Sequence, residues 1–156
     1  MRNFHQEALN ELENLRQQTP EDISLYTKMS RIYQSQQMFE EGLEVLNQAR
    51  VVAPQELSIT LEIARLYMSC EDFAQVIAIL QEARQTNPGN NEISSIISEA
   101  YARTGDHEMA IMELKTLISN DPDNTMARIQ LGRVYSISNM IDQASMTFKD
   151  IIADDP

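Results

Sequence analysis

The sequence is short of several kinds of residue, and each shortage argues against a class of protein. Its 156 residues include one cysteine, Cys70, which excludes an intramolecular disulfide framework and fits a reducing compartment. Only four glycines are present, which disfavours loop-rich all-β folds. The densest apolar run, residues 76–80, falls far short of the roughly 20 residues that a membrane-spanning helix needs.

Positive charge is also scarce. Twelve Lys and Arg residues stand against 24 Asp and Glu residues, and the formal net charge is −12. Binding to nucleic acid or to an anionic membrane surface needs an excess of basic residues, so we expect neither partner. The N-terminal residues 1–7 show no apolar signal segment, and we expect a cytoplasmic protein without direct membrane insertion.

What the chain does contain is a strict internal period of 34 residues. All five prolines keep this step, and four of the five tyrosines keep it too: Pro20, Pro54, Pro88, Pro122 and Pro156; Tyr33, Tyr67, Tyr101 and Tyr135. A period of this length is typical of a solenoid, in which each small unit buries its apolar face against its neighbours. The core is therefore expected to run along a stack of units.

Each unit is predicted to form two helices. If units begin three residues after a proline, they span 23–56, 57–90, 91–124 and 125–156. Positions 4, 7, 8 and 11 of the unit lie on one stripe of a helix, and positions 20, 24 and 27 form the same stripe on a second helix, at the spacing of amphipathic helices. The proline at position 32 ends the second helix. Polar residues then cap the next one: Asp22, Asn90 or Asn91, and Asn124 or Thr125.

These positions resemble the tetratricopeptide repeat family, whose pattern is W-x-x-L-G-x-x-Y followed by A-x-x-x-F, A and P. The fourth unit is most similar, with Leu131, Gly132, Tyr135, Ala144, Phe148 and Pro156. The tryptophan position departs from the pattern and holds Tyr26, Thr60, Ser94 and Arg128. The resemblance implies an all-α, right-handed superhelical solenoid of antiparallel helix pairs, with about four and a half repeats.

The half repeat lies at the N-terminus. Residues 1–20 fit a second helix alone, with Ala8, Leu12 and Leu15 at the apolar positions and Pro20 at the end. Residues 21–156 then form four repeats in one continuous domain. We expect the chain to be part of a longer chain or complex; alternatively, self-association or a partner covers the open ends of the solenoid.

No constellation in the sequence predicts catalysis, a metal site or a cofactor. His5 and His107 lie far apart and have no ligand partner at helical spacing. The four glycines form no phosphate-binding loop. Cys70 precedes Glu71 and Asp72, whose negative charge disfavours a reactive thiolate. We therefore expect a protein that is not an enzyme and binds no cofactor.

The charges separate between the two kinds of helix. The first 14 positions of the four units hold six basic and three acidic residues, a net charge of +3, so the rest of the chain carries −15. In the family that the chain resembles, first helices line a concave groove, and the resemblance therefore implies a mildly basic groove. The residues expected to contact a partner there are Lys28, Arg31, Gln34, Leu61, Arg65, Met68, Glu99, Arg103, Met126, Ile129 and Arg133.

Three arginines share the ninth position of the unit, namely Arg31, Arg65 and Arg133, and Glu99 is the exception. Arginines in register can hold the carboxylates of an acidic peptide through bidentate hydrogen bonds. Alternatively, they pair with Glu62, with Glu99 or with an acid on a neighbouring repeat.

The leading prediction is a non-enzymatic interaction module or scaffold that binds a peptide or partner helix, including an acidic one. Two alternatives stay open. One is a small acidic chaperone of a secretion system. The other is a self-assembling structural scaffold, because Phe148, Ile151 and Ile152 lack a following helix to cover them.

Overall fold

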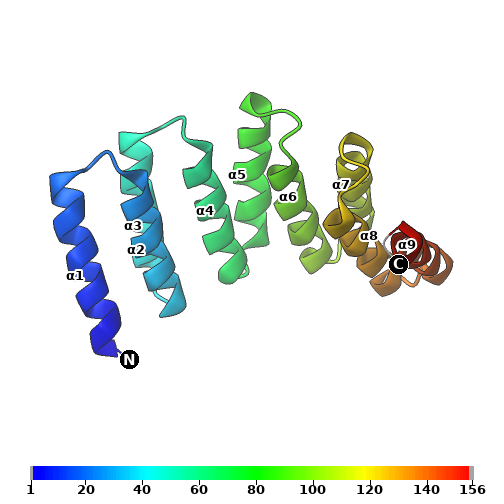
Figure 1. Cartoon of the computed structure of the whole chain (residues 1–156), viewed down its shortest axis with the longest axis horizontal. Helices are drawn as coiled ribbons and strands as arrows, with labels where there is room; N and C mark the ends of the chain where they lie inside the picture. The colour runs from blue at the N-terminus through cyan, green and yellow to red at the C-terminus, as the bar shows by residue number, and fades with distance from the viewer. Residues whose placement is uncertain (1, 155–156) are drawn as a thin grey trace. The chain divides into compact units, whose positions relative to one another are not determined.

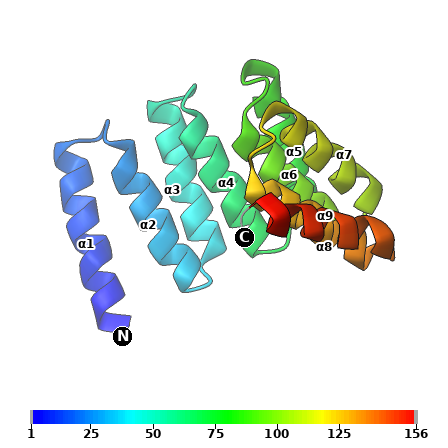
Figure 2. The same ribbon diagram turned by 45° about the vertical axis from the view of Figure 1, so that its right-hand side comes forward.

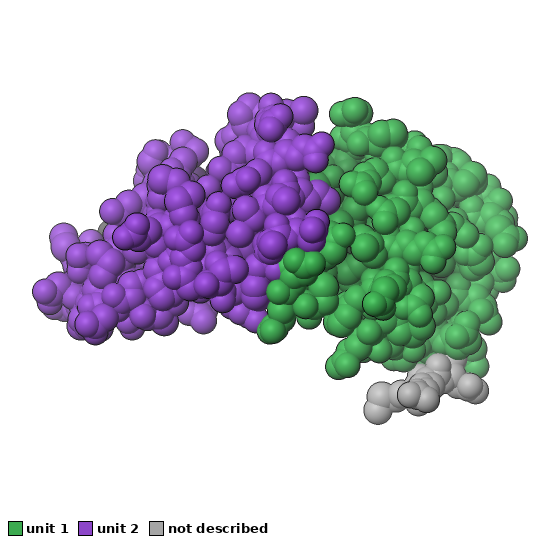
Figure 3. Space-filling view, turned by 180° about the vertical axis from the view of Figure 1, so that it is seen from behind, with its two compact units in different colours: residues 1–72 green, residues 73–156 purple. Residues whose placement is uncertain are grey.

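The structure, a computed structural model, describes residues 2–154. These residues form nine α-helices and no strand (Figure 1). They divide into two compact units, residues 1–72 (unit 1) and residues 73–156 (unit 2), coloured separately in Figure 3. The division falls between the two helices of the second predicted repeat. The single continuous domain stays a prediction.

Unit 1 contains four helices: α1 (Arg2–Gln18), α2 (Ile23–Ser35), α3 (Phe39–Val52) and α4 (Leu57–Ser69). Helix α2 packs against α1 and α3, and α4 packs against α3 and α2 (Figures 1 and 2). By their repeat positions, α2 and α4 are first helices, whereas α1 and α3 are second helices.

Unit 2 contains five helices: α5 (Phe73–Thr86), α6 (Asn91–Thr104), α7 (His107–Asn120), α8 (Thr125–Ile137) and α9 (Ile141–Asp154). Each packs against the next along the chain, and the pairs α6–α7 and α8–α9 are the most extensive (Figure 2). Here α6 and α8 are first helices, and α5, α7 and α9 are second helices.

Local chemistry sets where the helices begin and end. The side chains of Asp22, Asn90 and Asn124 each accept a hydrogen bond from a backbone N–H in the first turn of the following helix. These residues confirm the predicted caps and select Asn90 and Asn124 from the two pairs. Helices α3, α5 and α7 each end two residues before a proline, at Val52, Thr86 and Asn120, as expected from the conformation that proline imposes on the residue before it.

Small residues let paired helices approach closely, as the repeat positions predict. A Cβ added at Gly42 on α3 would lie 3.3 Å from the Ser30 hydroxyl on α2. A Cβ at Gly132 on α8 would lie 2.6 Å from the Phe148 ring on α9. The seventh position, which is apolar in every repeat, is buried throughout, at Met29, Ile63, Ile97 and Leu131.

The turn between the helices of each repeat has a left-handed residue at position 15. These residues are Gln37, Glu71, Gly105 and Asn139, with φ between 61° and 84°. Only Gly105 adopts this conformation without steric cost from a Cβ atom. The sequence did not reveal this feature, because three of the four residues are not glycine.

Helix α1 packs with less of its predicted stripe covered than the other second helices. Leu9 is buried, whereas Ala8 and Leu12 are half-buried and Leu15 is exposed. Tyr26 on α2 holds the neighbouring chain segment, because its hydroxyl donates a 2.8 Å hydrogen bond to the Pro20 carbonyl and its ring packs under the Arg16 guanidinium. Within residues 2–154, no helix has both the length and the apolar character needed to cross a bilayer.

Candidate functional site on the first helices

In unit 1, two arginines converge on one carboxylate. Arg31 on α2 donates two hydrogen bonds to Glu62 on α4, at 2.6 Å from Nη2 to Oε1 and 3.1 Å from Nε to Oε2. Arg65, one turn after Glu62 on α4, donates to Oε1 at 2.7 Å. We call Arg31, Glu62 and Arg65 the unit 1 triad. It is the internal pairing that the sequence left open as the alternative to ligand binding.

The triad is anchored on its acidic member. The Glu62 side chain is 10% exposed, against 63% for Arg31 and 42% for Arg65. Burial raises the pKa of Glu62, but the hydrogen bonds and charges of the two arginines outweigh this effect, so its net pKa is lowered. Conversely, hydrogen bonding to Glu62 raises the pKa of Arg31. The carboxylate is therefore charged at neutral pH and already occupies the bidentate position that Arg31 offers.

The surroundings of the triad are acidic. A cavity of about 500 Å³ lies beside it at the start of α2 and α4, and Glu21, Asp22, Glu56 and Glu62 contribute four carboxyl groups to its lining. Arg31 is the one basic residue of that lining. A ligand carboxylate would meet net repulsion there.

Unit 2 carries the same three repeat positions with different chemistry. The ninth position of α6 holds Glu99 where α2 has Arg31. The sixth position of α8 holds Gln130 where α4 has Glu62, and its ninth position keeps an arginine, Arg133. We call Glu99, Gln130 and Arg133 the unit 2 trio. Unit 2 therefore has an uncharged carboxamide, at Gln130, in the position where unit 1 has the carboxylate that binds its arginines.

The members of the unit 2 trio are not paired with one another. Arg133 and Glu99 are exposed, and neither forms a salt bridge within residues 2–154. The Gln130 Oε1 atom is buried and accepts no hydrogen bond in the described part of the chain. The Ser98 hydroxyl, which lines the same cavity as Gln130, donates instead to the Ser95 carbonyl at 2.7 Å.

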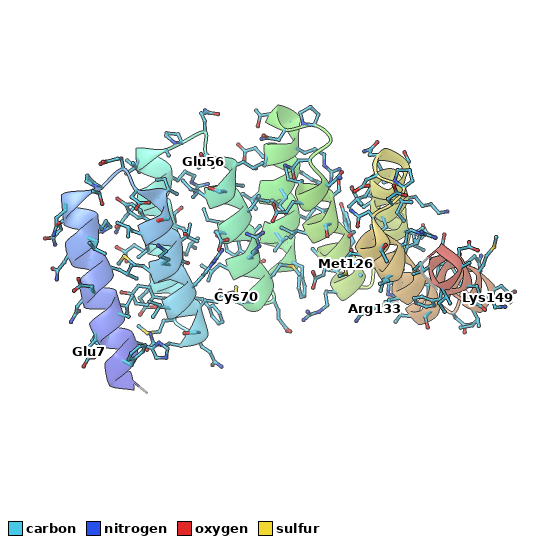
Figure 4. All side chains as sticks on the ribbon, in the orientation of Figure 1. Glu7, Glu56, Cys70, Met126, Arg133 and Lys149 are labelled. Atoms are coloured by element: carbon cyan, nitrogen blue, oxygen red, sulfur yellow. The ribbon has the colours of Figure 1, made fainter. Side chains whose placement is uncertain are left out.

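A cavity of about 450 Å³ opens beside the trio, between α6 and α8. Its apolar lining consists of Ala102, Leu114, Val134 and Ile137. Its polar lining consists of Ser98, Arg103 and the trio itself. This volume and this mixture of an apolar surface with a few polar groups are typical of ligand-binding pockets. Figure 4 shows Arg133 and Met126 projecting from α8.

The other predicted partner-binding residues differ in how much of their side chains is exposed to a partner. Lys28 and Met126 are exposed, and Met68 and Ile129 are half-buried. Gln34 donates a hydrogen bond to the Ser69 hydroxyl on α4. Leu61 has only 6% of its surface exposed and offers little to a partner. Arg103 lies over the Phe73 ring, 5.0 Å from its centroid.

Comparisons with known proteins agree with this architecture. Residues 95–124, within the third predicted repeat, match the family model of the tetratricopeptide repeat. This chain contains a tetratricopeptide repeat and has the tetratricopeptide repeat fold. The all-α solenoid fold predicted from the 34-residue period is thereby confirmed, and the match over residues 95–124 is to the family that the sequence resembles. No curated protein sequence matches the chain.

Several solved tetratricopeptide repeat structures are similar. MamA from Desulfovibrio magneticus RS-1, in its form from residue 41 to the end, has a TM-score of 0.78 and 14% identity, over 97% of this chain and 86% of that chain. A thermophilic TPR protein from Thermus thermophilus, TTC0263, has a TM-score of 0.76 and 18% identity, over 97% and 84%. YrrB, described as a TPR protein with an unusual peptide-binding site, has a TM-score of 0.71 and 16% identity, over 99% and 79%. At these identities the likeness concerns the fold.

Gln130 was given no role from the sequence, and Glu62 was named only as an alternative internal partner of the arginines. Both residues occupy the sixth position of their repeats, which faces the neighbouring first helix. A signal was present: the sixth and ninth positions change together, from Glu62 with Arg31 to Gln130 with Glu99. Among residues 2–154, no group of three or more His, Cys, Asp or Glu side chains is arranged to hold a metal ion.

Proposed function

We propose that this protein is a non-enzymatic interaction module that binds a peptide or a helix of a partner protein on the faces of its first helices. The observation that carries the proposal is the cavity between α6 and α8, which combines an apolar lining with an exposed, unpaired arginine, Arg133. Tetratricopeptide repeat proteins generally act as protein-interaction modules, and the fold supports the same role here. The cytoplasm is the proposed compartment, because the lone Cys70 is free and exposed.

Site-specific photo-crosslinking tests this proposal with an internal control. The chain offers two exposed methionines in unit 2, Met126 on first helix α8 (64% exposed) and Met112 on second helix α7 (51% exposed). Each is replaced in turn by p-benzoylphenylalanine, and the protein is irradiated in a lysate of the cells that make it. We expect a specific protein adduct from position 126 and none from position 112. Equal labelling, or labelling from position 112 alone, would place the partner elsewhere.

We infer self-association as a second candidate function, because three large apolar side chains of α9 are exposed. Ile141, Met146 and Ile152 are 57%, 67% and 67% exposed, and exposed apolar patches often mark interfaces. Sedimentation velocity over a range of concentrations tests this. Growth of a dimer or larger species that Met146→Lys abolishes supports self-assembly. A monomer at all concentrations counts against it.

A further inference from the structure

We infer that the unit 2 cavity recognises an extended peptide segment through two contacts: an acidic side chain on Arg133 and a backbone N–H on the Gln130 Oε1 atom. This inference rests on the proposed function and specifies the ligand of that site. It also assigns the acidic ligand to unit 2 alone, because in unit 1 the Glu62 carboxylate already binds the arginines that a ligand carboxylate would need.

The first contact follows from the charges around the ninth position. In unit 1, Glu62 binds Arg31 and Arg65 at 2.6 and 2.7 Å. Position 130 keeps the shape of that side chain but not its charge, and Glu99, the one carboxylate in the lining, forms no salt bridge with Arg133. Arg133 is exposed at the cavity and forms no salt bridge within the described residues. A ligand carboxylate at this place would occupy the role that Glu62 has in unit 1.

The second contact follows from an unmet hydrogen-bonding requirement. A buried acceptor without a donor is costly, and such groups in native proteins call for an explanation. Gln130 Oε1 is such an acceptor, and it belongs to a residue that lines the cavity. Ser98 lines the same cavity but donates its hydroxyl proton to Ser95. The atom has no appreciable exposed surface, so the Gln130 carboxamide must rotate toward the cavity before it can accept a hydrogen bond from a molecule that enters.

The geometry of a backbone donor favours an extended segment over a helix. Inside a helix each N–H is bonded to the carbonyl four residues earlier, so only the first turn has free donors. An extended segment keeps its N–H groups available. Because Gln130 and Arg133 are three residues apart, their side chains share one face of α8, and one short segment can reach both.

Peptide pools with blocked ends test the inference. The probes are acetylated and amidated heptapeptides with Asp or Glu at the centre and mixed Leu, Val and Ala neighbours. Matched pools carry Asn or Gln, or Lys or Arg, at the centre, and a further acidic pool is N-methylated at its three central amides. Binding to the full chain is measured by fluorescence anisotropy, and helical content and the melting temperature are recorded for every variant.

We expect the acidic pool to bind most tightly. Arg133→Gln should weaken it about tenfold, as expected for the loss of about 1.4 kcal/mol in a charge-assisted contact. Arg31→Gln is the matched control at the same repeat position, and it should leave affinity unchanged because Arg31 is held by Glu62. N-methylation should lower affinity by several-fold.

Gln130→Met separates recognition from structure. This substitution removes the acceptor at nearly constant volume, so the melting temperature should rise because a buried unpaired group is lost. The same substitution should weaken the acidic pool about fivefold, as for one hydrogen bond of about 1 kcal/mol. A variant that is more stable and yet binds more weakly cannot be explained by damage to the fold.

Several results would overturn the inference. They are equal binding of acidic and neutral pools, no loss with Arg133→Gln, no loss with Gln130→Met, or undiminished binding of the N-methylated pool. If one of these occurs while position 126 still crosslinks to a partner, the proposed function survives and only the ligand assignment fails. If no pool binds and position 126 gives no adduct, the proposed function fails as well.

Discussion

The two units present the same three repeat positions with opposite outcomes. In unit 1, Arg31, Glu62 and Arg65 form a closed ionic triad beside an acidic cavity. In unit 2, Glu99, Gln130 and Arg133 leave an arginine and a buried acceptor without partners beside a cavity with an apolar lining. An arginine in register along a repeat is therefore not by itself a binding residue. Whether it is paired within the chain depends on the residue at the sixth position.

Rebuilding the unit 1 arrangement in unit 2 has the largest expected effect. The double variant Glu99→Arg, Gln130→Glu places an internal carboxylate between two arginines, as Glu62 is placed in unit 1. We expect the affinity for the acidic peptide pool to fall by more than about tenfold, equivalent to over about 1.4 kcal/mol. Fluorescence anisotropy measures the affinity, and circular dichroism verifies the fold. Retained affinity would show that Arg133 does not need to be free to bind.

Opening the unit 1 triad is the reverse change. We expect Glu62→Gln to destabilise the protein by about 1–2 kcal/mol in urea unfolding. This is less than the roughly 3–5 kcal/mol typical of a broken buried pair, because Arg31 and Arg65 remain 63% and 42% exposed and water can solvate their charges. A change within experimental error would mean that the triad adds nothing to stability.

We also expect the stability difference between wild type and Glu62→Gln to depend on pH. The folded pKa of Glu62 is lowered below its ordinary value of 4.5. The stabilisation is therefore fully present above pH 4.5 and is lost as pH falls through the lower folded pKa. The stability difference between wild type and Glu62→Gln should be constant from neutral pH down to pH 4.5 and should shrink below it. A difference that widens on acidification would contradict the assigned sign.

The closeness of the helix contacts at glycine also differs between the two units. Gly132→Ala should cost about 1 kcal/mol, because the new Cβ would lie 2.6 Å from the Phe148 ring and force it to move. Gly42→Ala, on second helix α3, is the comparison in unit 1. It should be nearly neutral, since its nearest neighbours lie at 3.3–3.4 Å and alanine favours the helix. Thermal unfolding of both variants distinguishes the two cases, and the opposite ranking would contradict the packing described.

Most of the fold was predictable because residues of the same type occupy the same packing positions in all four repeats. Prolines, buried residues such as Ile63 and Ile97, and small residues such as Gly42 and Gly132 recur at fixed positions, and each corresponds to a helix end or a helix contact. The left-handed residues Gln37, Glu71 and Asn139 were not predictable. The turn imposes this conformation on Gln37 and Glu71, whose residue types do not favour it, whereas asparagine adopts it more readily.

The candidate site was predictable only in part. Charge counting placed Arg31, Arg65 and Arg133 together as potential ligand contacts, but it could not show which of them are neutralised. That depends on side-chain geometry between neighbouring helices, where Glu62 reaches both Arg31 and Arg65. The polar residue Gln130 was overlooked because an uncharged side chain does not alter the charge pattern. Its unmet acceptor becomes visible only in the structure.

The difference between the two units is tested most directly by nuclear magnetic resonance of the arginine side chains during titration with the acidic peptide pool. The Nε–Hε signals report each guanidinium separately in one sample. We predict that the Arg133 signal shifts in a saturable manner while the signals of Arg31 and Arg65 stay unchanged, because Glu62 already holds them. Equal shifts at Arg31 and Arg133, or shifts confined to Arg31 and Arg65, would contradict this assignment.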